Sequence, residues 1–387
     1  MPRPPAIRRR GPPNELPTWL VRAERLLIEA SRTVRLLGAV TPRNAAVERA
    51  RLAEQFASGA TPSPRWSYAR TDHSALRTAL DRAARRLSAE SHPVAQLYGA
   101  RARELELEAA LASEVGTSVF GALARARFSA TTAAATTRAS ALAAEWIANV
   151  PSPSEEPTIP SDAPVPESLF SRMREEVSRL RLPFAVIVQP SLSALAATGE
   201  RHILVASGRK TTREDVERTV MHEIEAHAIP RTRAQSARLA IFQLGTARGI
   251  DDQEGLALVL EERHDHLTTR RKHALAARQV AVELMDDGAS FVDVVTRLSK
   301  EHGVELEHAL AVAERAFRGG DGVSPGLGRE RVYLDAFLRV RTHLRAHPTD
   351  EGILTSGQVS LDAIATLTPF VQRRTEPPPR PPSTPTL

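Results

Sequence analysis

The stretch "TVMHEIEAHAIP", Thr219 to Pro230, governs how the rest of this sequence is interpreted, because two histidines in it bracket two glutamates. His222 and His227 are five positions apart. In a regular α-helix, residues four apart are about 40° out of register, whereas residues five apart diverge by about 140°. Both imidazoles can face one metal ion only if the helix carries a one-residue π-bulge between them, a distortion found most often at functional sites. The stretch therefore predicts a distorted helix and a metal site.

The composition restricts what kind of metal site this can be. The chain has 387 residues, 42% of them hydrophobic, which is enough for one large core or two smaller ones. It contains no cysteine, which excludes disulfides, thiolate zinc sites, iron–sulfur clusters and cysteine nucleophiles together. Any metal must therefore be held by histidine and carboxylate side chains.

Charge and hydropathy bear on location and partners. The formal net charge is +6, but arginine is spread over the whole chain, so nucleic acid is not an expected partner. The first residues, "MPRPPAIRRRGPPNEL", lead into prolines rather than an apolar signal region, and no run approaches the roughly 18 apolar residues of a membrane span. We expect a soluble, cytoplasmic protein without a membrane segment.

Hydrophobic periodicity predicts a mainly α fold with a small β-sheet, an α+β class with an N-terminal helical layer. Helical patterns cover 18–37, 44–57, 73–88, 91–127, 167–181, 252–285, 290–301, 304–317 and 329–346. Two short β-branched runs, "PFAVIVQP" and "HILVASG", predict a pair of strands just before the opening motif. The predicted organisation is a Pro/Arg tail at 1–16, a helical region at 17–150, a Pro-rich linker or loop at 151–166, a catalytic region at 167–370 and a Pro-rich tail at 371–387.

The helix that carries the motif has clear start and stop signals. Thr211, followed three residues later by Glu214, has the spacing of a capping box. Val216, Val220 and Ile224 can then form the inner face, and Pro230 is expected to end the helix.

A third metal ligand must come from elsewhere, and Glu254 in "DDQEGLALVLEE" is the best candidate. It lies near the start of the next predicted helix, where Gly255 allows another chain segment to approach closely. Two imidazoles and one carboxylate form the ligand set of an open catalytic Zn²⁺ site, with a position left for water. Glu223, adjacent to the first histidine, would lie beside the metal, where it could take a proton from the water and return it to a leaving amine.

Other histidine and glutamate residues that could bind a metal fit ordinary structural roles better. Glu225 could form a surface contact with His222, three residues away. His264 and His266 in "ERHDH" are two apart and would face different ways on a helix, as expected for a solvated face.

The chain resembles a known family through several segments. "MHEIEAH" (221–227) followed by "IFQLGTARGIDDQEGLALVLEER" (241–263) is similar to the bacterial proteins named for the QEGLA motif. Their eukaryotic members are the microtubule-associated tyrosine carboxypeptidases, which remove the C-terminal tyrosine of α-tubulin. The similarity extends roughly from Thr18 to Pro369 and includes "RARELELEAALASEVGT" and "SGQVSLDAIATLTP".

The resemblance implies a zincin-like metallopeptidase with His222, His227 and Glu254 as zinc ligands and Glu223 as general base. Family members also carry a Gly-Gly-Phe-Thr-Lys-Asp-x-x-Tyr segment. Here that region reads "FRGGDGVSPGLGRERVYL", which keeps Arg318 and Tyr333 but has Leu327, Gly328, Arg329 and Glu330 for Phe-Thr-Lys-Asp. If this segment binds substrate or stabilises the transition state, the departure would alter specificity or reduce activity.

A carboxypeptidase also needs a cation for the terminal carboxylate and a donor for the developing oxyanion. Arg318 is the candidate for the first task and Tyr333 for the second. The leading hypothesis is thus a zinc carboxypeptidase that removes an aromatic residue from the C-terminal tail of a peptide or protein. The alternatives are a zinc-binding regulatory protein without hydrolytic activity and a basic helical scaffold that binds acidic partners.

Overall fold

A computed structural model describes residues 17–129, 132–152, 156–190, 192 and 194–371. The predicted tails, apart from Val371, lie outside these residues. In the part of the chain that is described, no helix is both long and apolar enough to cross a membrane. The fold is mainly helical with two small sheets, as predicted.

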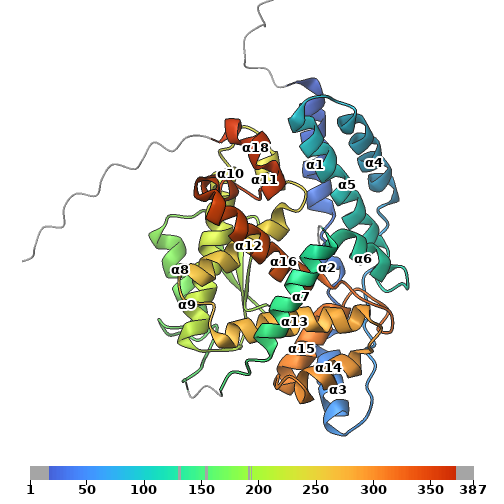
Figure 1. Ribbon diagram of the computed structural model, residues 1–387, viewed down its shortest axis with the longest axis vertical. Coiled ribbons are helices and arrows are strands. Elements are labelled where there is room, and N and C mark those ends of the chain that lie inside the picture. Colours follow the sequence, from blue (N-terminus) through green and yellow to red (C-terminus); the bar gives the residue numbers. More distant parts are fainter. Residues whose placement is uncertain (1–16, 130–131, 153–155, 191, 193, 372–387) are drawn as a thin grey trace, which may run out of the picture.

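The first third of the described chain forms a layer of helices (Figure 1). Their bounds are α1 Thr18–Thr33, α2 Leu36–Ala39, α3 Ala45–Ala57, α4 Ser74–Ser88, α5 Pro93–Ser113, α6 Phe120–Phe128 and α7 Ala133–Ile147. The predicted helical run at 91–127 is two helices, because the chain turns at Gly116 with a positive φ of 79°. Helix α7 lies within the predicted helical region 17–150, but no helical pattern was assigned to it, and it packs on both α13 and α16.

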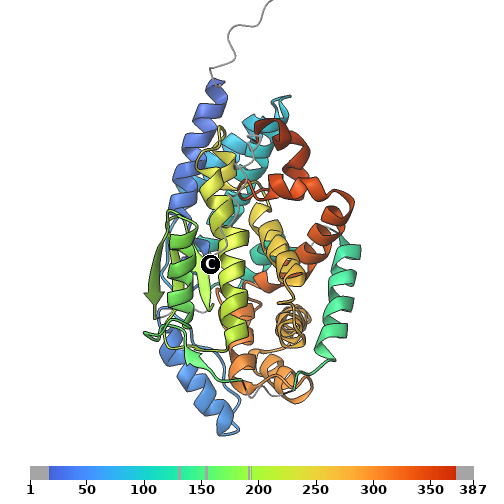
Figure 2. The ribbon, with the colours of Figure 1, turned by 90° about the vertical axis from the view of Figure 1, so that its left-hand side faces the viewer.

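The two predicted strands are confirmed as β2 (Ala185–Gln189) and β4 (His202–Ala206), which pair in parallel. A third strand, β3 (Ala196–Thr198), pairs antiparallel with β4 and forms the edge of a sheet ordered β2-β4-β3. Helix α8 (Leu169–Arg179) joins this sheet in a small core of its own, to which Met173, Ile203 and Val216 contribute. Figure 2 shows the strands beside the long helix that carries the motif.

The predicted capping box was wrong by one residue. Thr211 belongs to β5 (Lys210–Thr211), which pairs antiparallel with β1 (Ile159–Pro160) inside the Pro-rich stretch. Because Thr211 is held in that pairing, Thr212 becomes the N-cap of α9 (Arg213–Met221) and forms the box with Asp215. The pairing of β1 with β5 thus determines which of the two adjacent threonines caps the helix.

The predicted distortion of the motif helix is confirmed. Residues His222–Ala228 form a π-helix, η1, which extends over seven residues between α9 and α10 (Ile229–Ala234). The prediction that Pro230 ends the helix was wrong, since α10 continues past it. The Ile229 N–H already bonds back five residues to Ile224, so the proline lies where the hydrogen-bond pattern changes and its missing N–H is tolerated.

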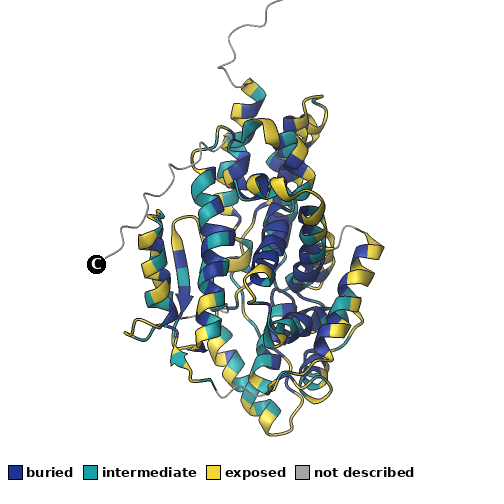
Figure 3. Cartoon of the chain, turned by 60° about the vertical axis from the view of Figure 1, so that its left-hand side comes forward, coloured by how far each residue is buried: buried dark blue, intermediate teal, exposed yellow. Residues whose placement is uncertain are grey.

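Helix α12 (Gly249–Arg263) is buried along most of its length and packs mainly on α16 and the π-helix (Figure 3). The remaining helices are α11 Ile241–Leu244, α13 Thr269–Asp286, α14 Phe291–Lys300, α15 Leu306–Phe317, α16 Val332–Ala346, α17 Glu351–Leu354 and α18 Ile364–Leu367, with 3-10 turns η2 Arg329–Arg331, η3 Pro348–Asp350, η4 Leu361–Ala363 and η5 Thr368–Phe370. The predicted run at 252–285 breaks into α12 and α13 near Asp265, whose φ is 58°.

Buried contacts join the N-terminal helices to α12. One hydrophobic core includes Leu20 of α1 and Leu367 of α18. Within it lies an ion-pair network: Arg127 of α6 bonds Glu108 of α5 at 3.0 Å and Asp251 of α12 at 3.1 Å. The first turn of α12 is therefore fixed by charges from the N-terminal layer.

Gly255 lets α12 and α16 approach each other closely. A Cβ atom at this position would lie 2.5 Å from the backbone of Ala336, closer than two such atoms can come. We therefore expect Gly255→Ala to destabilise the fold by about 1–3 kcal/mol through overpacking, although alanine normally favours a helix over glycine. Differential scanning calorimetry measures the effect as a lower melting temperature. Gly352 of α17 has open space around it and is the matched control: Gly352→Ala should not lower the melting temperature.

Candidate active site

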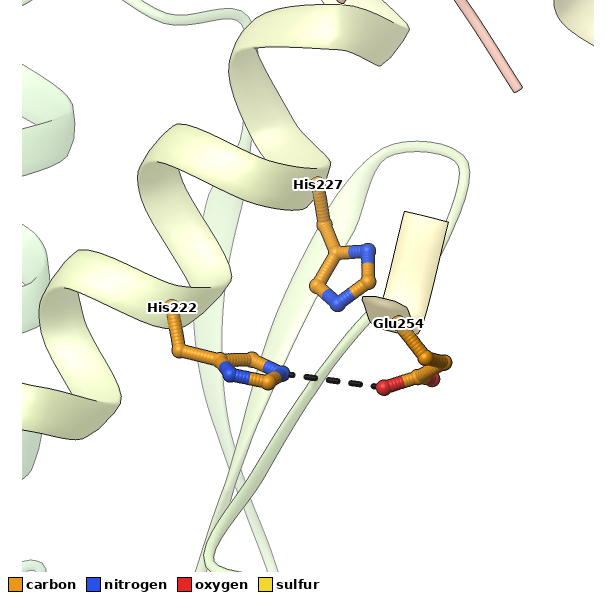
Figure 4. Close-up of side chains that lie close together, drawn as sticks. All are labelled: His222, His227 and Glu254. Atoms are coloured by element: carbon orange, nitrogen blue, oxygen red, sulfur yellow. Dashed lines mark ion pairs between the residues drawn. The ribbon is translucent and has the colours of Figure 1, made fainter. Parts of the chain in front are cut away.

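The π-helix and α12 bring the three predicted metal ligands together. Among the described residues, His222, His227 and Glu254 form a group whose potential ligand atoms all lie within 4.8 Å of one another. The Nε2 atom of His222 is 3.8 Å from the Glu254 carboxylate (Figure 4). The two imidazole centroids are 5.1 Å apart, so the π-helix places on one side two rings that a regular helix would separate.

Glu261 fixes the orientation of His222 from its other ring nitrogen. The Nδ1 atom of His222 is 2.8 Å from the Glu261 carboxylate, which is fully buried. Because a carboxylate accepts, Nδ1 donates its proton to Glu261, and Nε2 is the nitrogen directed toward Glu254. Arg271 of α13 holds Glu261 in turn with two hydrogen bonds, at 2.7 and 2.9 Å.

Gln253 plays the corresponding role for His227. Its Oε1 atom is 3.2 Å from Nδ1 of His227, and Gln253 is only 3% exposed. The segment Gln253-Glu254-Gly255 thus supplies an orienting amide, a candidate ligand and a close helix contact in three successive residues. Metal-binding histidines usually have such a partner on the second nitrogen, which fixes the tautomer and the direction of the ring.

The electrostatics of the cluster suit a cation. Burial opposes protonation of both histidines, and it lowers the pKa of His227, which favours the neutral form that binds metals. At His222, Glu254 and Glu261 outweigh burial and raise the pKa to about 9. Burial would raise the pKa of Glu254, but its ion pair with His222 and the charges of His227 and Arg329 outweigh this and hold that pKa well below its usual range. The site therefore concentrates negative charge around the two rings.

Glu261 gives a test of this orienting role. We expect Glu261→Gln to weaken metal binding at this candidate site by about 10–100-fold, the usual cost of removing such a partner from a metal-binding histidine. The neighbouring Glu262 is the matched control, because it lies on the same helix, pairs with Arg341 and faces away from His222. Titration with a competing chelator measures both affinities, and equal values for the two variants would exclude the orienting role.

Glu223 lies beside the cluster and is 7% exposed. Its Oε2 atom accepts a hydrogen bond of 2.8 Å from the hydroxyl of Thr198 in β3. Glu225, in contrast, points outward: its side chain is 43% exposed and lies 3.7 Å from the exposed His264. Glu223 is thus buried and Glu225 lies at the surface, but the neighbour of Glu225 is His264 rather than His222, with which a contact was considered from the sequence.

Tyr333 and Arg318 lie in a basic cluster next to Glu254. Tyr333 lies in the first turn of α16, is 7% exposed and interacts electrostatically with Glu254. Four arginines interact with its ring or hydroxyl: Arg278, Arg315, Arg318 and Arg329. Arg318 caps the end of α15 and is 8% exposed, and its buried Nε has no partner among the described residues. Burial, and then the nearby Arg315, lower the pKa of Arg318 to about 10.

The comparisons with known proteins bear on this arrangement. The profile of the microtubule-associated tyrosine carboxypeptidases matches residues 53–385, which is most of the chain. The chain belongs to this family. A search of curated proteins found no match. Membership places the chain among carboxypeptidases, which are hydrolases that act on the C-terminal end of a polypeptide.

The segment that departs from the tyrosine carboxypeptidase pattern keeps its charges at this site. Arg329, where the family pattern has lysine, lies 3.2 Å from Glu254. Glu330, where the pattern has aspartate, is buried and bonds Arg315 at 2.8 Å. The substitutions therefore lengthen or change side chains without removing the cation beside Glu254 or the anion within the basic cluster.

Sequence analysis missed several residues of the site. Glu261 lies seven positions after Glu254, so the two share a face of α12, and this spacing was a signal that could have identified it. Gln253 is adjacent to Glu254 in the motif itself. Thr198 and Arg271 come from separate elements, and no local pattern indicates that they reach the site.

Proposed function

We propose that this protein is a zinc-dependent metallocarboxypeptidase with a zincin-like fold. The observation that carries the proposal is the convergence of two imidazoles and one carboxylate within 4.8 Å, with a second, buried glutamate beside them. This pairing of an open ligand set with an adjacent base is the arrangement of hydrolytic zinc sites.

The residues of the cluster fit zinc. The Nδ1 atoms of His222 and His227 are engaged by Glu261 and Gln253, which leaves both Nε2 atoms for a metal. Two nitrogens and one carboxylate oxygen are the donors that catalytic zinc takes, and the chain has no competing thiolate. When bound, zinc would lower the pKa of a water molecule and polarise a carbonyl group.

Glu223 is proposed as the general base. Its carboxylate is buried and close enough to both histidines to favour their protonated forms, which supports this role. There it would take a proton from the attacking water and then donate it to the nitrogen of the departing amino acid. The proton removed at the first step is thus the one that the amine requires at the second.

The basic cluster is proposed to hold the terminal carboxylate of the substrate. Glu330 pairs closely with Arg315 and Glu254 pairs with Arg329, whereas the buried Nε of Arg318 has no hydrogen-bond partner among the residues that the structure describes, and its guanidinium forms no ion pair with them. A buried guanidinium without an anion is costly, and a substrate carboxylate with bidentate geometry would compensate it. This supports Arg318 as the residue that recognises the end of the chain.

Strand β3 supports an extended substrate. Ala206 and Gly199 each donate to a carbonyl across the β3 and β4 pair, so Leu195, Ala197 and Gly199 face β4. Ala196 and Thr198 therefore turn their N–H and C=O groups toward the open edge of the sheet. A peptide tail could pair there while its aromatic last residue lies near Tyr333.

Tyr333 is proposed to donate to the developing oxyanion through its hydroxyl group. We expect Tyr333→Phe to lower kcat by about 100-fold or more, the usual cost of one such donor, while zinc content stays unchanged. The measurement is steady-state hydrolysis alongside metal analysis. Unchanged turnover would remove Tyr333 from the mechanism and leave it as a packing residue of α16.

The function is tested by metal analysis of the purified protein, followed by a library of peptides that differ only in the last residue. Mass spectrometry should show release of one C-terminal residue, with aromatic ends preferred and C-terminally amidated peptides resistant. Bound zinc without any release would favour a non-hydrolytic regulatory protein, and protein that stays metal-free in excess zinc would overturn the proposal.

A further inference from the structure

We propose that Thr198, the last residue of strand β3, is a positioning residue that holds the Glu223 carboxylate in its reactive orientation. The inference rests on the proposed function, because it concerns the general base of that reaction. The sequence gives no indication of it, since Thr198 lies 25 positions before Glu223 and in a different element.

The contact is specific to one oxygen of the carboxylate. The Thr198 hydroxyl donates to Oε2 of Glu223 at 2.8 Å, and the Glu223 backbone carbonyl lies 3.3 Å from the same hydroxyl. Among the residues that the structure describes, no other group donates a hydrogen bond to this carboxylate. Oε1 accepts no hydrogen bond from the described residues and remains available to accept the proton of the attacking water.

The strand is a rigid support for this hydroxyl. Thr198 pairs with Ile203 of β4, which is fully buried, and Ala196 of β3 is 5% exposed. The Gly199 N–H bonds the carbonyl of His202 at 2.8 Å and closes the turn directly after Thr198. β3 also packs against the π-helix, so the donor and the base are held by elements in direct contact.

A glutamate on a helix has several rotatable bonds, and the π-helix alone does not fix where its carboxylate points. A hydrogen bond from a second element restricts the carboxylate to one orientation and prepares it for proton transfer. Thr198 does not touch the substrate's reacting atoms in this scheme. It acts through Glu223, and the proton passes from water to Oε1 of Glu223 and then to the leaving amine.

The test compares Thr198→Val with Thr198→Ser. Valine keeps the shape and the β-branch of threonine but cannot donate, whereas serine keeps the hydroxyl and loses the methyl group. We expect Thr198→Val to lower kcat by about 10–100-fold, the range for losing a hydrogen bond to a charged group, with KM and zinc content unchanged. Thr198→Ser should restore most of kcat.

A second measurement does not depend on turnover. Crystal structures of the wild type and of both variants should show one orientation of the Glu223 carboxylate in the wild type and in Thr198→Ser, and a changed or multiple orientation in Thr198→Val. Wild-type kcat in Thr198→Val, or equal loss in both variants, would overturn the inference, as would an unmoved carboxylate in the valine variant. If the wild-type protein proves inactive, the proposed function fails, and the crystal structures still decide whether Thr198 orients Glu223.

Discussion

Glu223→Gln is expected to give a protein that retains zinc but loses peptide hydrolysis, with kcat lowered by about 10²–10⁴-fold. Glutamine has nearly the same shape as glutamate and can still occupy the buried position beside His222. It cannot take a proton from water, however, so the step that generates the nucleophile loses its base. Metal analysis and hydrolysis of the preferred peptide, measured on the same preparation, test both halves of this expectation.

Glu225→Gln is the matched control, because it makes the same chemical change two residues away. Glu225 is largely exposed and faces His264 rather than the candidate ligands. Its substitution should leave kcat within about twofold of wild type, since surface changes of this kind have small effects. Equal loss of activity in both variants would argue that the helix as a whole, rather than the Glu223 carboxylate, is what hydrolysis requires.

His227→Ala is expected to abolish stoichiometric zinc binding and, with it, activity. Glu254 and His222 would remain, and two ligands are too few for the three-ligand set of a catalytic zinc site. We expect affinity to fall by more than about 100-fold, the upper range for loss of a supporting residue alone. Zinc should raise the melting temperature of the wild type by stabilising the folded state, and this rise should vanish in the variant.

The exposed His264 provides the comparison for that experiment. It stacks with His266 at the end of α12, and it lies outside the group of candidate ligands. His264→Ala should keep both zinc binding and its stabilising effect. If His227→Ala still binds one zinc ion per chain with wild-type affinity, the ligand assignment is wrong and another residue must complete the site.

The parts of the candidate site that could be predicted are those indicated by sequence patterns within a single helix or by ligand chemistry. The spacing of His222 and His227 required a distorted helix, and the π-helix confirms it. The third candidate ligand followed from the need for one more carboxylate near a helix start. Both inferences depend on geometry within one helix or on ligand chemistry, and neither needs the arrangement of distant segments.

Sequence patterns did not predict the features that depend on contacts between segments far apart in the chain. Thr211 and Thr212 both suit an N-cap, and only the pairing of Thr211 with Ile159 makes Thr212 the cap. The contacts of Thr198 and Arg271 with the site link elements far apart in sequence. Helix α7 was missed because its alanine-rich sequence gives weak periodicity, although α13 and α16 cover it in the fold.

The ion pair between Arg127 and Asp251 bears on how this protein can be shortened. A fragment starting after the first 150 residues would leave Asp251, which is 2% exposed, without its guanidinium, at the base of the helix that carries Glu254. It would also uncover the apolar surface that α5 and α7 protect. Removing one partner of a buried ion pair typically costs about 3–5 kcal/mol. The smallest fragment suitable for expression and crystallisation therefore has to include α5, α6 and α7.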